Sequence, residues 1–251
     1  MLPKTKFSSH ALPVPIPNFR TIASVFAISP SGMKTATDIA GYEIQIPSSA
    51  DTLVALPRIT LIQGSWVVPT VSCVNGETTF TRYLVGVQGD DGGADFYCSS
   101  GSAVYFPDCA FLSFDTCCTG IASADKVSLG DKMTSITTEN YKTHTAKVTL
   151  KDTKSWTYTH TFADTRTLTE GDWILEGGPG DTGTPLTKFT LLKTSGNFAT
   201  IGSKHGSLAS FSPSCTIQWF YELVNGADIL ATTSSLSGAT SAFSIKWLKA
   251  S

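Results

Sequence analysis

Short runs of β-branched and aromatic residues, each broken by Gly, Asp, Asn or Ser, follow one another from residue 41 to the end of the chain. The clearest runs cover residues 59–68, 83–87, 147–150, 156–162, 188–192 and 217–224. In 156–162 aromatic residues alternate with threonine, which is the period of a half-buried strand. No convincing long amphipathic helix interrupts the series. Many short strands without helices predict an all-β sandwich or barrel.

The turn signals and proline positions set the expected organisation. Residues 146–150 and 156–162 are joined through 151–155 and predict a β-hairpin. Residues 1–40 are rich in Pro, Ser and Thr, and Pro13, Pro15 and Pro17 occupy alternate positions. Because proline cannot donate to a strand ladder, we expect an extended N-terminal arm over 1–40. The remaining 41–251 are expected to form a single β-sandwich domain, a size that such sandwiches often reach.

Charge and hydropathy exclude some function classes. The net charge of −2 gives no electrostatic reason to bind nucleic acid or an anionic membrane. No apolar run is long enough to span a bilayer. The start Met-Leu-Pro-Lys lacks the basic-then-apolar pattern of a signal peptide. The protein is therefore expected either to be intracellular or to have lost a leader that is absent from this chain.

The six cysteines favour a secreted protein, or one in the lumen of the secretory pathway. They form no Cys-x-x-Cys pair and the histidines are scattered, so neither a zinc site nor another cofactor is expected. Disulfides are the better use of these thiols, and the even count leaves about fifteen complete pairings open. The cysteines are Cys73, Cys98, Cys109, Cys117, Cys118 and Cys215.

Several segments, in sequence order over residues 41–248, resemble the eqolisins, the fungal glutamic peptidases. Gln63-Gly-Ser-Trp-Val-Val-Pro-Thr-Val71 resembles their Trp-x-Val-Pro strand, and Tyr83-Leu-Val-Gly-Val-Gln-Gly-Asp90 resembles their Trp-Val-Gly-Ile-Asp-Gly segment. Lys126-Val-Ser-Leu-Gly-Asp131 resembles their Ile-x-x-Gly-Asp turn. The resemblance implies a concanavalin-like sandwich of two curved antiparallel sheets, with a cleft on the concave face.

The family's catalytic glutamate ends a motif that Glu170-Gly-Asp-Trp-Ile-Leu-Glu176 resembles. In the family this glutamate acts as general base on water and then as acid toward the leaving amine, while a glutamine amide donates to the oxyanion. The resemblance therefore implies that Glu176 is catalytic. Strand alternation places Asp172 and Ile174 on the same face as Glu176, and Trp173 and Leu175 in the core.

The family's glutamine has no direct counterpart. Counting along the second motif, its position falls at or beside Cys98, and a thiol is too weak a donor to replace a carboxamide. Gln88, where the family has an aspartate, is the remaining candidate. The same comparison places Leu84 at an aromatic position of the family, and Phe111 and Ser113 in a strand where Ser113 replaces an acidic residue. Efficient peptidase activity is therefore not expected.

The cysteines near this position could be paired in more than one way. Cys98 and Cys109 lie on strands expected to be neighbours, so they could form a bridge, or Cys98 could be a buried free thiol beneath a remodelled cleft. A structural disulfide elsewhere is the alternative. Cys117 and Cys118 are adjacent and are expected to pair with different partners, one of them with Cys73.

Three functions compete on these observations. The first is a repurposed eqolisin fold that binds a hydrophobic small molecule and catalyses a cyclisation, as fungal hetero-Diels–Alderases do in terpenoid and polyketide biosynthesis, without a cofactor. Its cleft would be lined by Leu84, Phe96, Cys98, Phe111 and Ile174, with Glu176, Gln88, Asp172 and Ser113 as polar groups. The second is an acid glutamic endopeptidase, and the third is a non-catalytic ligand-binding module. The sequence does not indicate an oligomeric state.

Overall fold

The computed structural model describes residues 33–46, 57–110, 126–180, 182–211 and 217–250. The described residues are almost entirely β-structure, with one short 3-10 helix, η1, at Leu208–Ser210. Within them, no helix has the length and apolar character needed to cross a membrane. The prediction of an all-β, two-sheet curved antiparallel sandwich is confirmed.

Fifteen strands follow one another along the described chain. They are β1 (Met33–Ala36), β2 (Ile39–Gln45), β3 (Ile59–Val67), β4 (Thr81–Val87), β5 (Asp90–Ser99), β6 (Ser102–Ala110), β7 (Lys132–Asn140), β8 (Thr145–Asp152), β9 (Thr157–Ala163), β10 (Glu170–Gly177), β11 (Leu192–Ile201), β12 (Lys204–Ser207), β13 (Ile217–Asn225), β14 (Asp228–Thr233) and β15 (Ser244–Trp247).

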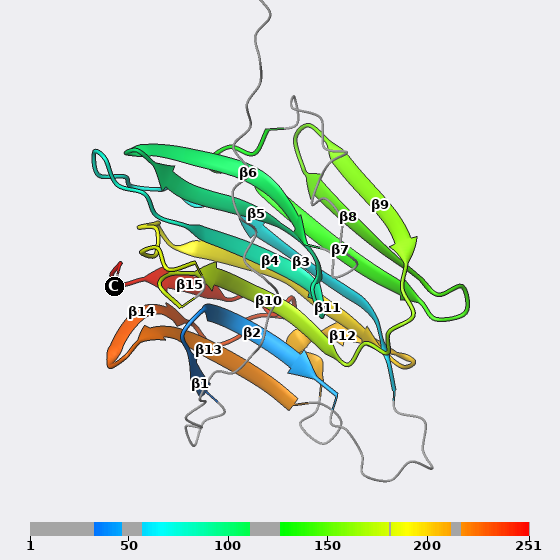
Figure 1. Ribbon diagram of the computed structural model, residues 1–251. Helices are drawn as coiled ribbons and strands as arrows, with labels where there is room; N and C mark the ends of the chain where they lie inside the picture. Colours follow the sequence, from blue (N-terminus) through cyan, green and yellow to red (C-terminus); the bar gives the residue numbers. More distant parts are fainter. Residues whose placement is uncertain (1–32, 47–56, 111–125, 181, 212–216, 251) are drawn as a thin grey trace, which may run out of the picture.

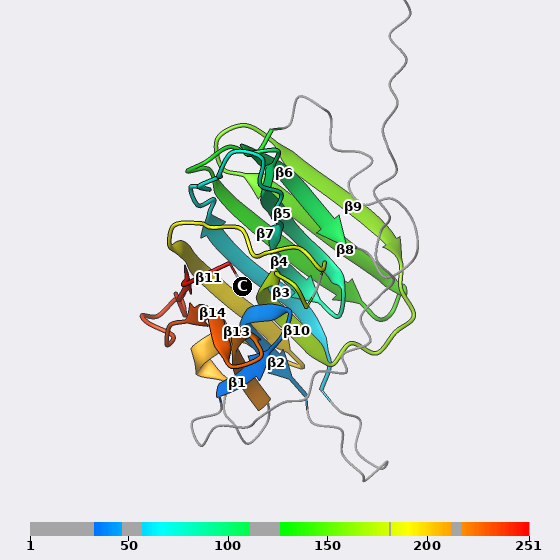
Figure 2. The ribbon, with the colours of Figure 1, turned by 60° about the vertical axis from the view of Figure 1, so that its left-hand side comes forward.

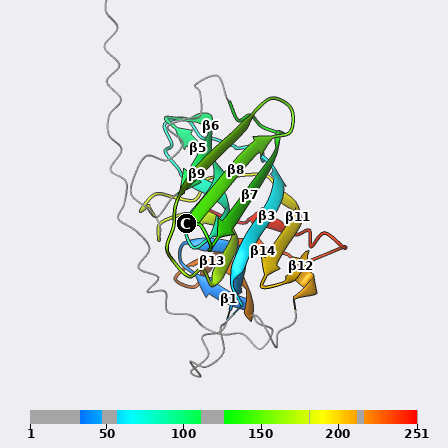
Figure 3. The same ribbon diagram turned by 90° about the vertical axis from the view of Figure 1, so that its right-hand side faces the viewer.

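The strands form two layers. In the first layer the hydrogen-bonded order is β6-β5-β4-β10-β2-β13, and these strands run side by side across Figure 1. In the second layer the order is β11-β3-β7-β8-β9, and these strands face the viewer in Figure 3. Side chains of β4, β5 and β10 in the first layer pack against β3, β7 and β8 in the second. The hydrophobic core lies between the layers.

Strands β14 and β15 connect the two layers. β14 pairs with β13 of the first layer, and β15 pairs with both β14 and β11 of the second. The orange and red ribbons of this connection lie at the left of Figure 2. Almost all pairings are antiparallel, but β1 pairs in parallel with β13. The hydrogen-bonded order of the described strands therefore runs without interruption from β6 to β9, and the two layers share no open edge where β14 and β15 join them.

Large aromatic side chains fill the core. Trp66, Tyr83, Phe96 and Trp173 are at most 1% exposed. The rings of Trp66 and Tyr83, which come from different layers, lie 5.2 Å apart between centroids. Burying an aromatic side chain contributes roughly 1.5–3 kcal/mol, so a few such contacts dominate the packing between the layers.

Polar groups from one layer bond to the backbone of the other. The Trp173 indole N–H on β10 donates to the Gln63 carbonyl on β3 at 2.8 Å. The Ser135 hydroxyl on β7 donates to the Val85 carbonyl on β4 at 3.0 Å. A Cβ at Gly64 would lie 2.7 Å from Trp173 Cδ1, so only glycine fits where the indole crosses β3. These contacts fix how β10 sits over the second layer.

Two of the expected element boundaries are wrong. Residues 33–40 were assigned to an extended arm, but β1 and the start of β2 lie there and belong to the first layer. The rest of the arm lies outside the described residues. Residues 188–192 were expected as one strand, but only Phe189 forms an isolated bridge before β11 begins at Leu192. The hairpin expected over 146–162 is confirmed as β8 and β9.

Candidate functional site

Strand β10 presents two different faces. Trp173 and Leu175 are fully buried in the core cluster between the layers, as the alternation predicts. Asp172, Ile174 and Glu176 alternate with them and therefore point away from that cluster. We call the side of the first layer that carries Asp172, Ile174 and Glu176 the outer face. Its neighbours on β4 and β5 follow from the strand register.

Glu176 is paired with an arginine on the neighbouring strand. Arg82 on β4 lies directly opposite Glu176 in the antiparallel register. Its Nε atom is 3.0 Å from Glu176 Oε2, and the two side chains are 25% and 11% exposed. Glu176 therefore lies at the margin between the buried layer and solvent, with a permanent cation against its carboxylate.

Two further carboxylates surround Arg82. Asp95 on β5 is the residue directly opposite Arg82 on its other side. Asp108 on β6 approaches from the next strand, with 3.8 Å between its Oδ2 and Arg82 Nη1. The ring of Phe80 lies 5.4 Å from the guanidinium carbon. The guanidinium is thus held among groups from four adjacent strands or their ends, which restricts its orientation.

An apolar pair lies beside the charged groups. Leu84 and Ile174 are directly opposite each other on β4 and β10, and both are nearly fully buried. Each is bordered on its far side by a glycine, Gly93 on β5 and Gly41 on β2. Three of the residues expected on one face, Leu84, Ile174 and Glu176, are therefore neighbours.

The next row of the outer face is acidic. Asp172 on β10 lies opposite Glu43 on β2, and both are buried. The Tyr221 hydroxyl on β13 donates to Glu43 at 2.8 Å. Burial, followed by the charge of Glu43, raises the pKa of Tyr221 above its usual range, so the phenol stays a donor. The outer face is more highly charged than the apolar cleft that the cyclisation hypothesis requires.

Two residues expected on the outer face lie in the core instead. Phe96 and Cys98 are fully buried in the cluster between the layers, and the Phe96 ring packs against that of Phe189 with 5.7 Å between centroids. Cys98 forms a disulfide with Cys73. The expected Cys98–Cys109 bridge, the free thiol at Cys98 and the pairing of Cys73 with Cys117 or Cys118 are therefore wrong. Asp95 and Tyr97, which alternate with Cys98, are the β5 residues turned toward the outer face.

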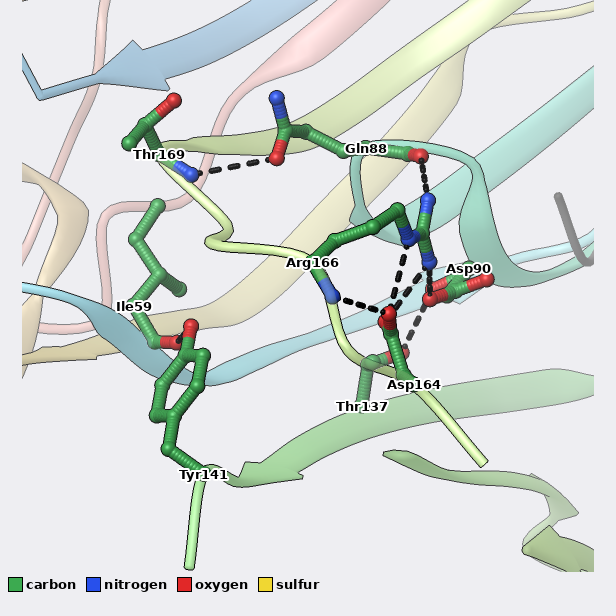
Figure 4. Close-up of polar contacts among 8 residues, drawn as sticks. All are labelled: Ile59, Gln88, Asp90, Thr137, Tyr141, Asp164, Arg166 and Thr169. Carbon is green, nitrogen blue, oxygen red and sulfur yellow. Dashed lines mark hydrogen bonds and ion pairs between the residues drawn. The ribbon is translucent and has the colours of Figure 1, made fainter. Parts of the chain in front are cut away.

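Gln88 lies far from Glu176, at the opposite end of β4. It occupies the β4–β5 turn with a φ of 43°. Its side-chain carbonyl accepts a hydrogen bond from the Thr169 backbone N–H at 3.2 Å, as Figure 4 shows. The structure therefore does not bring Gln88 together with Glu176 as a catalytic pair. Phe111 and Ser113, also expected in the cleft, lie outside the described residues.

A second cluster of carboxylates lies around Arg166, near Gln88. The guanidinium of Arg166 forms ion pairs with Asp90 and Asp164 and donates to the backbone carbonyl of Gln88 (Figure 4). Glu139 on β7 completes the cluster and is 9% exposed. Burial raises the pKa of Asp90 to about 7, although Arg166 opposes this. Burial and the charge of Asp164 raise the pKa of Glu139 to about 8.

Two groups of carboxylates are close enough to share a cation. Glu43, Glu170 and Asp172 form one group on the outer face, and Asp90, Glu139 and Asp164 form the other. In the second, Arg166 already supplies a cation to two of the three carboxylates. Clusters of acidic residues are common without a metal, so neither group is assigned as a metal site.

The fold and the outer face together define a β-sandwich protein with a carboxylate–guanidinium pair on one sheet. The sequence profile of the Peptidase A4 family matches residues 48–247, which is most of the chain, and the chain belongs to this family. This confirms the resemblance to the eqolisins. No curated protein sequence matches the chain closely enough to define a nearer relative.

Solved structures of eqolisins share the fold. The chain is similar to a scytalido-glutamic peptidase with a transition state analog inhibitor, at 17% identity and a TM-score of 0.62. A second structure of that peptidase, with a peptide-based transition state analog, gives 15% identity and a TM-score of 0.59. SCP-B, an eqolisin in complex with the tripeptide Ala-Ile-His, gives 14% and 0.55. Each comparison covers 84% of this chain and 98% of the other.

Sequence reasoning did not single out Arg82, Asp95 or Asp108. The signal for Asp95 is present in the sequence, because the apolar residues at 94, 96 and 98 alternate with Asp95 and Tyr97. That alternation places Cys98 inside and Asp95 outside. Placing Asp95 opposite Arg82 requires the register of β4 and β5, which the turn at Gln88 fixes.

Proposed function

We propose that this protein hydrolyses peptide bonds at acid pH, with Glu176 as the general base and acid. The observation that carries the proposal is the position of Glu176, which ends the family's motif and faces outward beside Arg82 in a strongly polar environment. A hydrolase needs a carboxylate that can reach both water and substrate. A side chain that is 11% exposed meets that need.

Cys98 does not count against peptidase activity. The resemblance places it beside the scissile bond, where a thiol cannot act as an oxyanion donor. Because Cys98 points into the core and is oxidised to a disulfide, its side chain does not lie on the outer face and neither supplies nor displaces a donor there. The charged groups around Glu176 fit proton transfer better than the binding of an apolar substrate.

The test is hydrolysis of a denatured protein and of a peptide library, at about pH 3 and about pH 7, by the wild type and by the Glu176→Gln variant. Gln keeps the size of the side chain and removes the base. We expect cleavage by the wild type and none by the variant. Cleavage that survives in Glu176→Gln would show that another group does the chemistry, or that a contaminant does.

A second candidate, binding and cyclisation of an apolar small molecule, is favoured by one observation. Leu84 and Ile174 form a buried apolar pair beside Glu176, bordered by glycines that add no side chains. Terpenoid-like and polyketide-like compounds should then bind more weakly to Leu84→Ala, by about tenfold. Equal binding to both proteins, or no binding to either, removes this candidate.

We also propose that the protein works in an oxidising compartment and is secreted. The Cys73–Cys98 disulfide supports this proposal, because disulfides persist in such compartments and are rare in the cytosol. Secretion would also allow the acidic surroundings that a peptidase of this kind requires. Detection of the protein in culture medium of its source, with the disulfide intact, tests this.

A further inference from the structure

Hydrolysis by Glu176 needs a hydrogen-bond donor for the oxyanion, and neither neighbouring strand places a carboxamide beside Glu176. β4 contains none, and Gln45 on β2 lies opposite Glu170 at the far end of β10. Strand β5, next but one to Glu176, contains neither Gln nor Asn. Gln88 is held at the opposite end of β4 by its contact with Thr169. Amide hydrolysis without such a donor is slower by about 10²–10³ in kcat. Another group must therefore supply the donor.

We propose that Arg82 is that donor, and that its guanidinium stabilises the oxyanion during peptide hydrolysis. This inference rests on the proposed function of Glu176. Arg82 is the residue directly opposite Glu176 on β4, and its Nε lies 3.0 Å from Glu176 Oε2. A guanidinium carries five N–H groups in a rigid plane, so it can contact a carboxylate and a second oxygen at once.

The reaction balances with these two groups alone. Glu176 takes a proton from water as the water oxygen attacks the carbonyl carbon of the substrate. The electron pair of the C=O bond moves to the oxygen, and Arg82 donates N–H groups to the resulting oxyanion. The carbonyl then re-forms, the C–N bond breaks, and Glu176 returns its proton to the leaving nitrogen. One water is consumed, and a carboxylic acid and an amine are released.

The surroundings of Arg82 hold the guanidinium in one plane. Asp108 lies 3.8 Å from Nη1, and Asp95 is the cross-strand neighbour on the side away from Glu176. The Phe80 ring lies 5.4 Å from the guanidinium carbon. An oxyanion donor acts best when it is oriented before the reaction, because no reorganisation is then needed in the transition state. The side chain is 25% exposed, so substrate can reach it.

Three substitutions separate a donor from a partner that only positions Glu176. Arg82→Met removes charge and donors, Arg82→Gln keeps neutral N–H donors, and Arg82→Lys keeps the charge without the planar fork. Lys147→Met, an exposed lysine on β8 of the other layer, is the matched control. We expect kcat to fall about 10²–10³-fold in Arg82→Met with KM nearly unchanged. Arg82→Gln should recover at least about tenfold of that loss, because its carboxamide can donate to the oxyanion.

A second measurement does not depend on turnover. A phosphinic peptide carries the charge and tetrahedral shape of the intermediate, and a matched uncleaved peptide is measured in the Glu176→Gln background. Arg82→Met should lose affinity for the phosphinic peptide by about the same factor as kcat/KM, while the neutral peptide binds as before. Circular dichroism and thermal unfolding establish that each variant is folded.

The outcomes distinguish this inference from the proposed function. An inactive wild type overturns both. Activity that requires Glu176 but persists within about threefold in Arg82→Met overturns the role of Arg82 and leaves that of Glu176. If Arg82→Lys is fully active and Arg82→Gln is as poor as Arg82→Met, Arg82 only pairs with Glu176 and is not the donor.

Discussion

The disulfide between Cys73 and Cys98 lies on the core side of β5, and it fixes which β5 residues face Glu176. Because side chains alternate along a strand, Asp95 and Tyr97, which precede Cys98, point to the outer face. Thr79, just before β4, makes two hydrogen bonds to the Cys98 backbone. Its N–H donates to the Cys98 carbonyl, and its hydroxyl oxygen accepts from the Cys98 N–H. The disulfide therefore helps define the candidate site without belonging to it.

Removing this disulfide should destabilise the fold and leave the chemistry of Glu176 intact. The bond closes a loop with a sequence separation of 25 residues. A loop of that length corresponds to about 3 kcal/mol of stabilisation. The double variant Cys73→Ala/Cys98→Ala should lose that much in the free energy of unfolding measured with guanidinium chloride. Equal stability of the variant and the oxidised wild type would contradict the pairing.

The fold was predictable because its signals are local and repeated. Period-two patterns, turn residues and the absence of helical periodicity gave the strands of the β8–β9 hairpin, and the order of motifs gave the sandwich. The stretch 33–40 was harder, since β1 joins β13 through a parallel pairing across almost the whole chain. A four-residue strand with such a distant partner leaves no local signature.

The candidate site was only partly predictable. Alternation along β10 placed Trp173 and Leu175 in the core, and the structure confirms this. On β5, counting from a family motif gave Cys98, and an error of one residue moves every side chain to the other face. Arg82 was missed because its importance comes from its cross-strand partner, which only the register reveals.

Replacing Gln88 should affect stability and not hydrolysis. Its side chain accepts a hydrogen bond from the Thr169 N–H, and its φ of 43° lies in the left-handed region. Gln88→Asn tolerates that backbone conformation but is too short to reach Thr169. We expect a loss of about 1 kcal/mol in the free energy of unfolding and kcat/KM within about twofold of the wild type. A large loss of kcat in a folded variant would return Gln88 to the catalytic machinery.

The indole N–H of Trp173 should contribute measurably to stability. It donates to the part-buried Gln63 carbonyl at 2.8 Å, and Trp173→Phe removes this donor. Loss of the hydrogen bond should lower the free energy of unfolding by about 1–3 kcal/mol, in addition to the loss caused by the smaller ring. Trp247→Phe is the control, because within the described structure the Trp247 indole nitrogen has no hydrogen-bond partner. Similar losses of unfolding free energy for the two variants would show that ring volume alone matters.

Two carboxyls of the cluster around Arg166, those of Glu139 and Asp90, should make the fold more stable at acid than at neutral pH. Asp164 acts in the opposite sense, because its hydrogen bonds to Arg166 outweigh burial and lower its pKa. In the folded protein the pKa of Glu139 is raised from 4.5 to about 8, mainly by burial and then by Asp164 and Asp90. The pKa of Asp90 is raised from 3.8 to about 7, with Asp91 and Asp164 adding to burial and Arg166 opposing it. The folded state therefore binds more protons than the unfolded state between these limits. The stability that this binding gives is fully present below about pH 4 and is lost as the pH rises toward 8.

Replacing Glu139 by glutamine tests this dependence at one residue. Gln has nearly the same shape and never ionises, so Glu139→Gln should flatten the fall in unfolding free energy between pH 4 and pH 8 and stabilise the protein at about pH 8 by roughly 2 kcal/mol. The substitution keeps Asp90 and Asp164, with which Arg166 forms ion pairs (Figure 4). Asp228→Asn, at an exposed carboxylate on β14, is the control and should shift stability by less than about 1 kcal/mol without changing its slope with pH. Denaturant unfolding at several pH values measures both variants. A Glu139→Gln variant with the same slope as the wild type would show that Glu139 is ionised in the folded protein throughout this range.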